Sequence, residues 1–147
     1  MAQMTNDPFA HFVEAQNPVF SRALAELRAG RKQSHWMWFV FPQIAGLGRS
    51  AMAQRYALSS LDEVKRYLAH PVLGPRLAET TSAVLSHVDE NGRPLKSIHA
   101  IFGSPDDLKF HSSMTLFHRA APDDPLYAKA LTVFFGGDED GETLKRI

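Results

Sequence analysis

Two segments of the sequence concentrate side chains that can bind a ligand or carry out chemistry. In the later one, Lys109 lies one helical turn before Ser113, and Ser112 follows the same lysine by three residues. A lysine beside a serine hydroxyl can lower the pKa of the serine and activate it as a nucleophile. The order is the reverse of the S-x-x-K motif of Ser–Lys hydrolases, and hydroxyls on a crowded helix more often bond to the preceding turn. The pair is therefore an alternative to ligand binding, not the first choice.

The same segment also contains potential metal ligands. Asp107, His111 and His118 share one face of a helix, and His35 or His99 can complete a coordination shell. Seven histidines in 147 residues make such a coincidence easy, and no H-E-x-x-H motif is present. The chain has no cysteine, which excludes thiolate sites and cysteine nucleophiles. We therefore expect no metal and no cofactor.

The earlier segment runs from Trp36 to Ser50 and has the sequence WMWFVFPQIAGLGRS. Either Trp36 or Trp38 can stack on a planar ligand, although an aromatic run of this kind usually places at least one ring in the core. The glycines match the dinucleotide fingerprint G-x-G-x-x-G/A, but that site needs a strand leading into the glycine turn. Pro42 interrupts the approach, so we do not expect a Rossmann site.

A simpler anion site remains possible at the glycines. Backbone amides near Gly46, Gly48 and Ser50 can hold a small anion if a helix opens at Ser50, and Arg49 adds charge. The competing interpretation is a tight loop in which the glycines only permit close packing.

These observations predict a compact domain with a cleft beside the Trp36–Ser50 segment that binds a small ligand with a planar and an anionic part. Trp38 would supply stacking, and Arg49 or Lys109 would supply charge. An enzyme that uses Lys109, Ser113 or His35 as acid, base or nucleophile in the same cleft is one alternative, and a structural or partner-binding module is another. The candidate ligand-binding residues are His35, Trp36, Trp38, Gln43, Gly46, Gly48, Arg49, Ser50, Asp106, Lys109, Ser112 and Ser113.

The elements that must position these residues are predicted to be helices. Asn17-Pro18 and Ser104-Pro105 each place a capping side chain before a proline, and Ser60 with Glu63 fits a capping box. Apolar residues follow helical spacing, and clean alternating runs of strand length are absent. We expect an all-α domain of about seven or eight helices over residues 1–147, with Trp36–Phe41 as a short buried helix.

Composition excludes several function classes. Sixteen basic residues balance sixteen acidic ones, and a zero net charge argues against generic binding to nucleic acids or anionic membranes. The longest apolar run is far shorter than a membrane span, and the first residues lack the features of a signal peptide. We therefore expect a cytoplasmic protein.

The segment from Trp36 to Ser50 closely resembles the signature of domain-of-unknown-function family 1810, a set of small proteins that sometimes carry the label calpastatin. The resemblance extends over most of the chain. It includes Asp7-Pro8-Phe9, Arg31-Lys32, Tyr67-Leu68, His70-Pro71, Ile101-Phe102-Gly103, Asp106, Lys109, residues 112–117, Phe134-Phe135 and Gly137. It implies a mainly helical fold and no established activity. True calpastatins are disordered inhibitors, whereas this composition is that of a packed domain.

Overall fold

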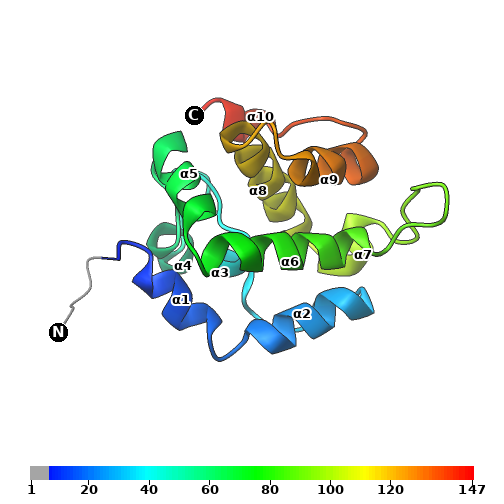
Figure 1. Ribbon diagram of the computed structural model, residues 1–147, viewed down its shortest axis with the longest axis horizontal. Helices are drawn as coiled ribbons and strands as arrows, with labels where there is room; N and C mark the ends of the chain where they lie inside the picture. The colour runs from blue at the N-terminus through cyan, green and yellow to red at the C-terminus, as the bar shows by residue number, and fades with distance from the viewer. Residues whose placement is uncertain (1–6) are drawn as a thin grey trace.

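The computed structural model describes residues 7–147, which form ten helices joined by loops (Figure 1). In Figure 1, α6 crosses the middle of the view, with α1 and α2 below it and α8, α9 and α10 above it. The helices are α1 (Ala10–Gln16), α2 (Phe20–Ala29), α3 (Met37–Val40), α4 (Ala51–Arg55), α5 (Leu61–Ala69), α6 (Leu73–Leu85), α7 (Ile98–Phe102), α8 (Asp106–Ala120), α9 (Pro125–Phe135) and α10 (Gly141–Leu144).

The all-α prediction is confirmed, but the predicted number of helices is wrong. Residues 7–147 contain only two isolated β-bridges, Ile44–Leu58 and Val88–Pro94, and no longer strand. The sequence underestimates the number because four of the ten helices are short: α3, α4, α7 and α10 have only four or five residues each. A single turn contains too few residues to establish an apolar period in the sequence.

Local capping signals predicted some helix starts correctly. The Ser60 hydroxyl accepts a hydrogen bond from the amide of Glu63 at the start of α5, as expected. The Glu63 carboxylate accepts in return from the amide of Ser59, one residue before the expected partner. The Trp36–Phe41 run forms the short buried helix α3, also as expected.

The two predicted proline-associated caps are wrong. The helix after Asn17-Pro18 begins only at Phe20, and Asn17 instead ends α1 and accepts a hydrogen bond from Arg76. Ser104 does not cap α8, which begins after Pro105 without a side-chain cap. Asn17 thus ends the preceding helix, a role that its residue type alone does not distinguish from capping the next one.

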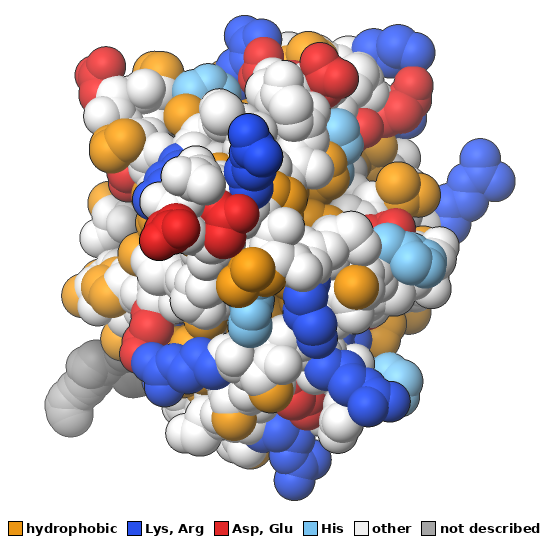
Figure 2. All heavy atoms as spheres, turned by 90° about the vertical axis from the view of Figure 1, so that its right-hand side faces the viewer, with side chains coloured by type: hydrophobic (Ala, Val, Ile, Leu, Met, Phe, Trp, Pro, Cys, Tyr) orange, Lys and Arg blue, Asp and Glu red, His pale blue; other side chains and the backbone are white. Residues whose placement is uncertain are grey.

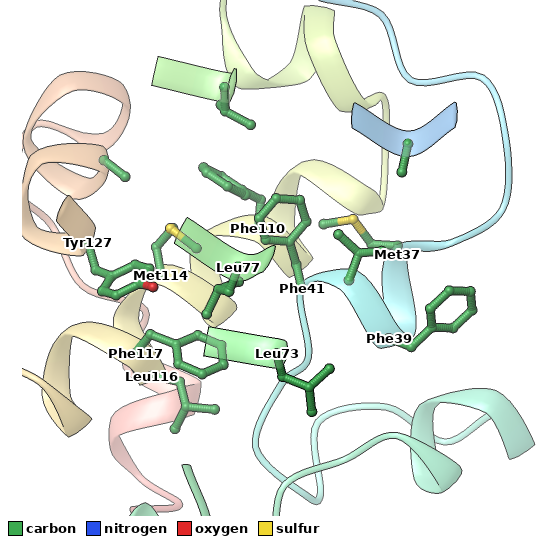
Figure 3. Close-up of a cluster of buried hydrophobic side chains, with 14 of the residues drawn as sticks. Met37, Phe39, Phe41, Leu73, Leu77, Phe110, Met114, Leu116, Phe117 and Tyr127 are labelled. Carbon is green, nitrogen blue, oxygen red and sulfur yellow. The ribbon is translucent and has the colours of Figure 1, made fainter. Parts of the chain in front are cut away.

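Helix α8 lies in the centre of the core, because apolar residues on more than one of its faces are buried. Phe110, Met114, Leu116 and Phe117 are all fully buried. Figure 3 shows Phe110 beside Phe41, and the rings meet edge to face with centroids 5.1 Å apart. Helices α5, α7, α9 and α10 all pack against α8. This packing fixes the first turn of α8, which carries Asp106 and Lys109.

Within residues 7–147, no helix combines the length and the apolar character needed to cross a bilayer.

Candidate functional site

Two adjoining cavities lie on either side of the first turn of α8. The first, which we name the α3–α8 cavity, has a volume of about 390 Å³ and is lined by residues that include His35, Trp38, Asp106 and Lys109. The second, the α8–α10 cavity, has a volume of about 280 Å³. Pro105 and Lys109 line both cavities. Together they form one groove with Lys109 at its middle.

Three charged side chains lie together at the α3–α8 cavity. The Lys32 ammonium is 2.8 Å from one carboxylate oxygen of Asp106, and the Lys109 ammonium is 3.7 Å from the other. The Lys32 side chain is only 7% exposed and also donates a hydrogen bond to the Ser34 carbonyl oxygen. Two lysines against one aspartate leave this cluster with a formal charge of +1. The buried lysine is neutralised by Asp106, whereas Lys109 reaches the cavity surface.

The two tryptophans have different environments. Trp36 is fully buried, and its indole N–H donates to Glu26 at 3.0 Å. Trp38 is half-buried and lines the α3–α8 cavity. The Lys109 ammonium lies 5.3 Å from the centroid of the Trp38 ring, within cation–π range. Trp38 can therefore contact a ligand, and Trp36 belongs to the core.

The structure brings together many but not all of the predicted site residues. His35, Trp38, Asp106 and Lys109 line the α3–α8 cavity, and Gln43, Gly48 and Ser112 line the α8–α10 cavity. Two predicted residues, Trp36 and Ser113, are buried and line neither cavity. Three others, Gly46, Arg49 and Ser50, are exposed and also line neither cavity.

The two serines of α8 are placed in ways that do not favour nucleophilic catalysis. Ser113 is fully buried and lines neither cavity, and its hydroxyl has no hydrogen-bond partner among residues 7–147. Ser112 donates to the Leu108 carbonyl oxygen at 3.1 Å and to the Asp140 carboxylate at 2.9 Å. The first contact is the bond to the preceding turn expected for a serine on a crowded helix.

The glycine loop has a packing role in the structure. A Cβ atom on Gly48 would lie 2.4 Å from the Cβ of Ala53, closer than two side chains can approach. Gly46 has a φ of +99°, which disfavours any residue with a side chain. Ser50 caps α4 by accepting a hydrogen bond from the amide of Ala53. These contacts support the packing interpretation of the loop.

Lys32 is a site residue that the sequence analysis missed. It appears in the sequence only as part of a basic pair with Arg31. Its significance comes from Asp106, which lies far along the chain and reaches Lys32 only through the packing of α8. Its ammonium also lies 4.9 Å from the centroid of the ring of Trp36, which is only four residues further along the chain.

The potential metal ligands do not converge. The Asp107 carboxylate lies 3.1 Å from the ring of His99, whereas the ring of His111 contacts the Asp138 carbonyl oxygen at 2.7 Å. In the part of the chain that the structure describes, no three His, Asp or Glu side chains are arranged to hold a metal ion.

Glu26 holds the segment that carries His35 and leads into α3. Its carboxylate accepts hydrogen bonds from the amides of Gln33 and Ser34, the Ser34 hydroxyl and the Trp36 indole. Burial raises the pKa of this carboxyl, but the four donors together lower it from 4.5 to about 2. In the folded protein Glu26 therefore stays ionised at pH values well below those at which a glutamate usually becomes protonated.

This pKa predicts a specific loss of stability in acid. The folded-state pKa of Glu26 lies below its unfolded value, so its contribution is present above about pH 4.5 and is lost as the pH falls toward 2. We expect Glu26→Gln to lower the melting temperature at neutral pH. The difference between parent and variant should shrink at about pH 3. Thermal melts at both pH values test this, and a difference that stays constant between them would contradict it.

Fold and groove together define a class: a small all-α domain with a charged, aromatic-edged groove beside one central helix. The model of the family described as "Protein of unknown function (DUF1810)" matches residues 6–147, and the chain belongs to this family. The resemblance in the sequence is thereby confirmed.

A solved structure shares this fold. The crystal structure of the conserved hypothetical protein Rv1873 from Mycobacterium tuberculosis matches with a TM-score of 0.88 and 50% sequence identity. The match covers 95% of this chain and 96% of that one. A comparison with curated proteins found no match.

Proposed function

We propose that this domain binds a small ligand with a planar and an anionic part in the groove formed by the two adjoining cavities. The observation that carries the proposal is the position of Lys109, which lines both cavities and lies over Trp38 and beside Asp106. The volume of the α3–α8 cavity, about 390 Å³, falls in the range of small-molecule sites.

The groove offers a separate contact for each part of the ligand. The formal charge of +1 on the lysine–aspartate cluster favours an anionic group in the α3–α8 cavity near Lys109, whereas Asp140 and Glu142 line the α8–α10 cavity. The half-buried ring of Trp38 offers a surface for the planar part. His35 and Gln43, in the two cavities, offer hydrogen-bonding groups that can select among ligands.

An enzyme would use the same groove. Lys109 and His35 line the α3–α8 cavity, so either can act as an acid or base toward a bound molecule. Turnover separates this alternative from binding, because a binding domain releases its ligand chemically unchanged.

The binding proposal predicts that Lys109→Ala weakens ligand affinity by about tenfold, because a charge-assisted contact is lost. Arg49→Ala removes the same charge from an exposed position outside both cavities and should change affinity by less than about twofold. The probes are nucleoside monophosphates and aromatic carboxylates, followed by tryptophan fluorescence and calorimetry. Trp38→Phe should remove the fluorescence response while the calorimetric signal remains.

Two results would contradict the proposal. One is the absence of binding by every probe at millimolar concentration. The other is equal loss of affinity in Lys109→Ala and Arg49→Ala, since this would indicate general charge attraction rather than a site. Chromatography of the probes after incubation tests for turnover at the same time.

A further inference from the structure

A third cavity lies away from the groove, along one side of α2. We name it the α2 hollow; its volume is about 550 Å³, and residues of α2, the segment that follows it and Lys96 line it. Figure 2 views the side of the molecule on which α2 ends, and Lys and Arg side chains lie on both the upper and the lower part of this face, among acidic and apolar ones. From its charges and shape we infer that the α2 hollow binds a small ligand with two or more linked phosphate groups.

Two arginines of the hollow are free to bind. Arg22 and Arg31 are exposed, and neither guanidinium has a carboxylate or hydrogen-bond partner among residues 7–147. Arg28 on the same helix differs, because its guanidinium lies 3.5 Å from the Glu79 carboxylate and outside the hollow. A guanidinium presents paired N–H donors that match the oxygens of a phosphate group.

The third cation of the hollow is held in place. The Lys96 ammonium donates a hydrogen bond of 2.9 Å to the carbonyl oxygen of Gly30, at the end of α2. An ammonium has three N–H donors, so two remain for a ligand. This contact ties the loop before α7 to the end of α2 and fixes one wall of the hollow.

The single carboxylate in the hollow cancels only one of its three positive charges. Both oxygens of Glu26 already accept hydrogen bonds from residues 33–36, so they are not available to pair with the arginines. Three cations against this one carboxylate give the hollow a formal charge of +2. An anionic ligand is therefore favoured, and a cationic or neutral one is not.

The spacing of the cations favours linked phosphates over a single one. Arg22, Ala25, Glu26 and Ala29 share one face of α2, and this face extends over roughly 10 Å. The two alanines leave room for a ligand to lie along the helix between the arginines. Arg22 lies near the start of this row and Arg31 follows the end of the helix, so a single phosphate is too short to contact both, whereas a chain of linked phosphates is long enough.

Calorimetric titration with inorganic tripolyphosphate at low ionic strength tests the inference. We expect saturable binding by the parent protein and affinity at least about tenfold weaker in the double variant Arg22→Ala/Arg31→Ala. Arg28→Ala removes a charge from the same helix but outside the hollow, so its affinity should stay within about twofold of the parent. All three positions are exposed, so thermal melts should show that every variant folds.

Three results would overturn the inference: no saturable binding, equal affinity in the double variant and the parent, or citrate binding as tightly as tripolyphosphate. The last would show attraction of any polyanion rather than recognition of phosphate. The inference is independent of the proposed groove, because Lys109 does not line the α2 hollow. Lys109→Ala should accordingly leave tripolyphosphate binding unchanged.

Discussion

Gly74→Ala is expected to destabilise the protein by about 3 kcal/mol. Gly74 is buried at the start of α6, where the chain passes closest to the end of α5. A Cβ atom there would lie 2.1 Å from the carbonyl oxygen of Leu68. Because the obstructing atom belongs to the backbone, a change of side-chain rotamer cannot relieve the overlap. The two helices must separate, and α5 and α6 both pack into the core.

The sign of this effect distinguishes tertiary packing from helix propensity. Alanine is favoured over glycine in a helix by about 1 kcal/mol, so propensity alone predicts stabilisation. Gly141 provides the control, because it opens α10 and a Cβ atom added to it would meet no other atom within 4 Å. Gly141→Ala should leave stability unchanged or raise it by up to about 1 kcal/mol. Urea titration measures both variants, and a stabilised Gly74→Ala protein would refute the packing argument.

The features predicted correctly from the sequence are those set by neighbouring residues. The Ser60 side chain and the Glu63 amide that it caps are three positions apart, so their types alone indicate the helix start. Gly30 ends α2 in the left-handed conformation, which a glycine adopts more readily than any other residue, so its type alone is a local signal for a helix end. The short helix predicted at Trp36–Phe41 is present over Met37–Val40, although a run this short has no diagnostic spacing of its own.

The features that could not be predicted depend on contacts between distant residues. The sequence places Lys109 beside Asp106 on one helix, but not Lys32, which the fold brings to the same carboxylate. It assigns stacking to Trp38, but no local pattern explains why Trp36 is the buried ring. That difference arises because Glu26, from another helix, binds the indole of Trp36.

The two cavities also could not be predicted, because each is lined by residues that are far apart in the sequence. Pro105 and Lys109 separate the two halves of the groove only because α8 lies between α3 and α10. The glycine fingerprint, in contrast, has a strictly local explanation. Gly48 permits the close approach of Ala53, so its similarity to a nucleotide-binding motif has a packing origin.

Phe110→Ala is expected to lower the free energy of unfolding by about 3–5 kcal/mol. The Phe110 ring is fully buried and stacks on Phe102 with centroids 4.9 Å apart. Phe41 meets it edge to face, and Phe135 lies 6.2 Å away. Removing this ring leaves a cavity among three aromatic side chains, and both the lost contacts and the cavity contribute to the cost.

The same substitution should loosen the wall of the groove, because Phe102 lines the α3–α8 cavity and loses its stacking partner. Leu108→Ala is the matched control: the residue is on the same helix, two positions away, but 64% exposed, so stability should change by less than about 0.5 kcal/mol. Urea titration compares the two variants. If both lost similar stability, Phe110 would not be the packing centre that holds the first turn of α8 in place. If Phe110→Ala alone unfolds more easily, the position of Lys109 in the groove depends on the aromatic cluster beneath it.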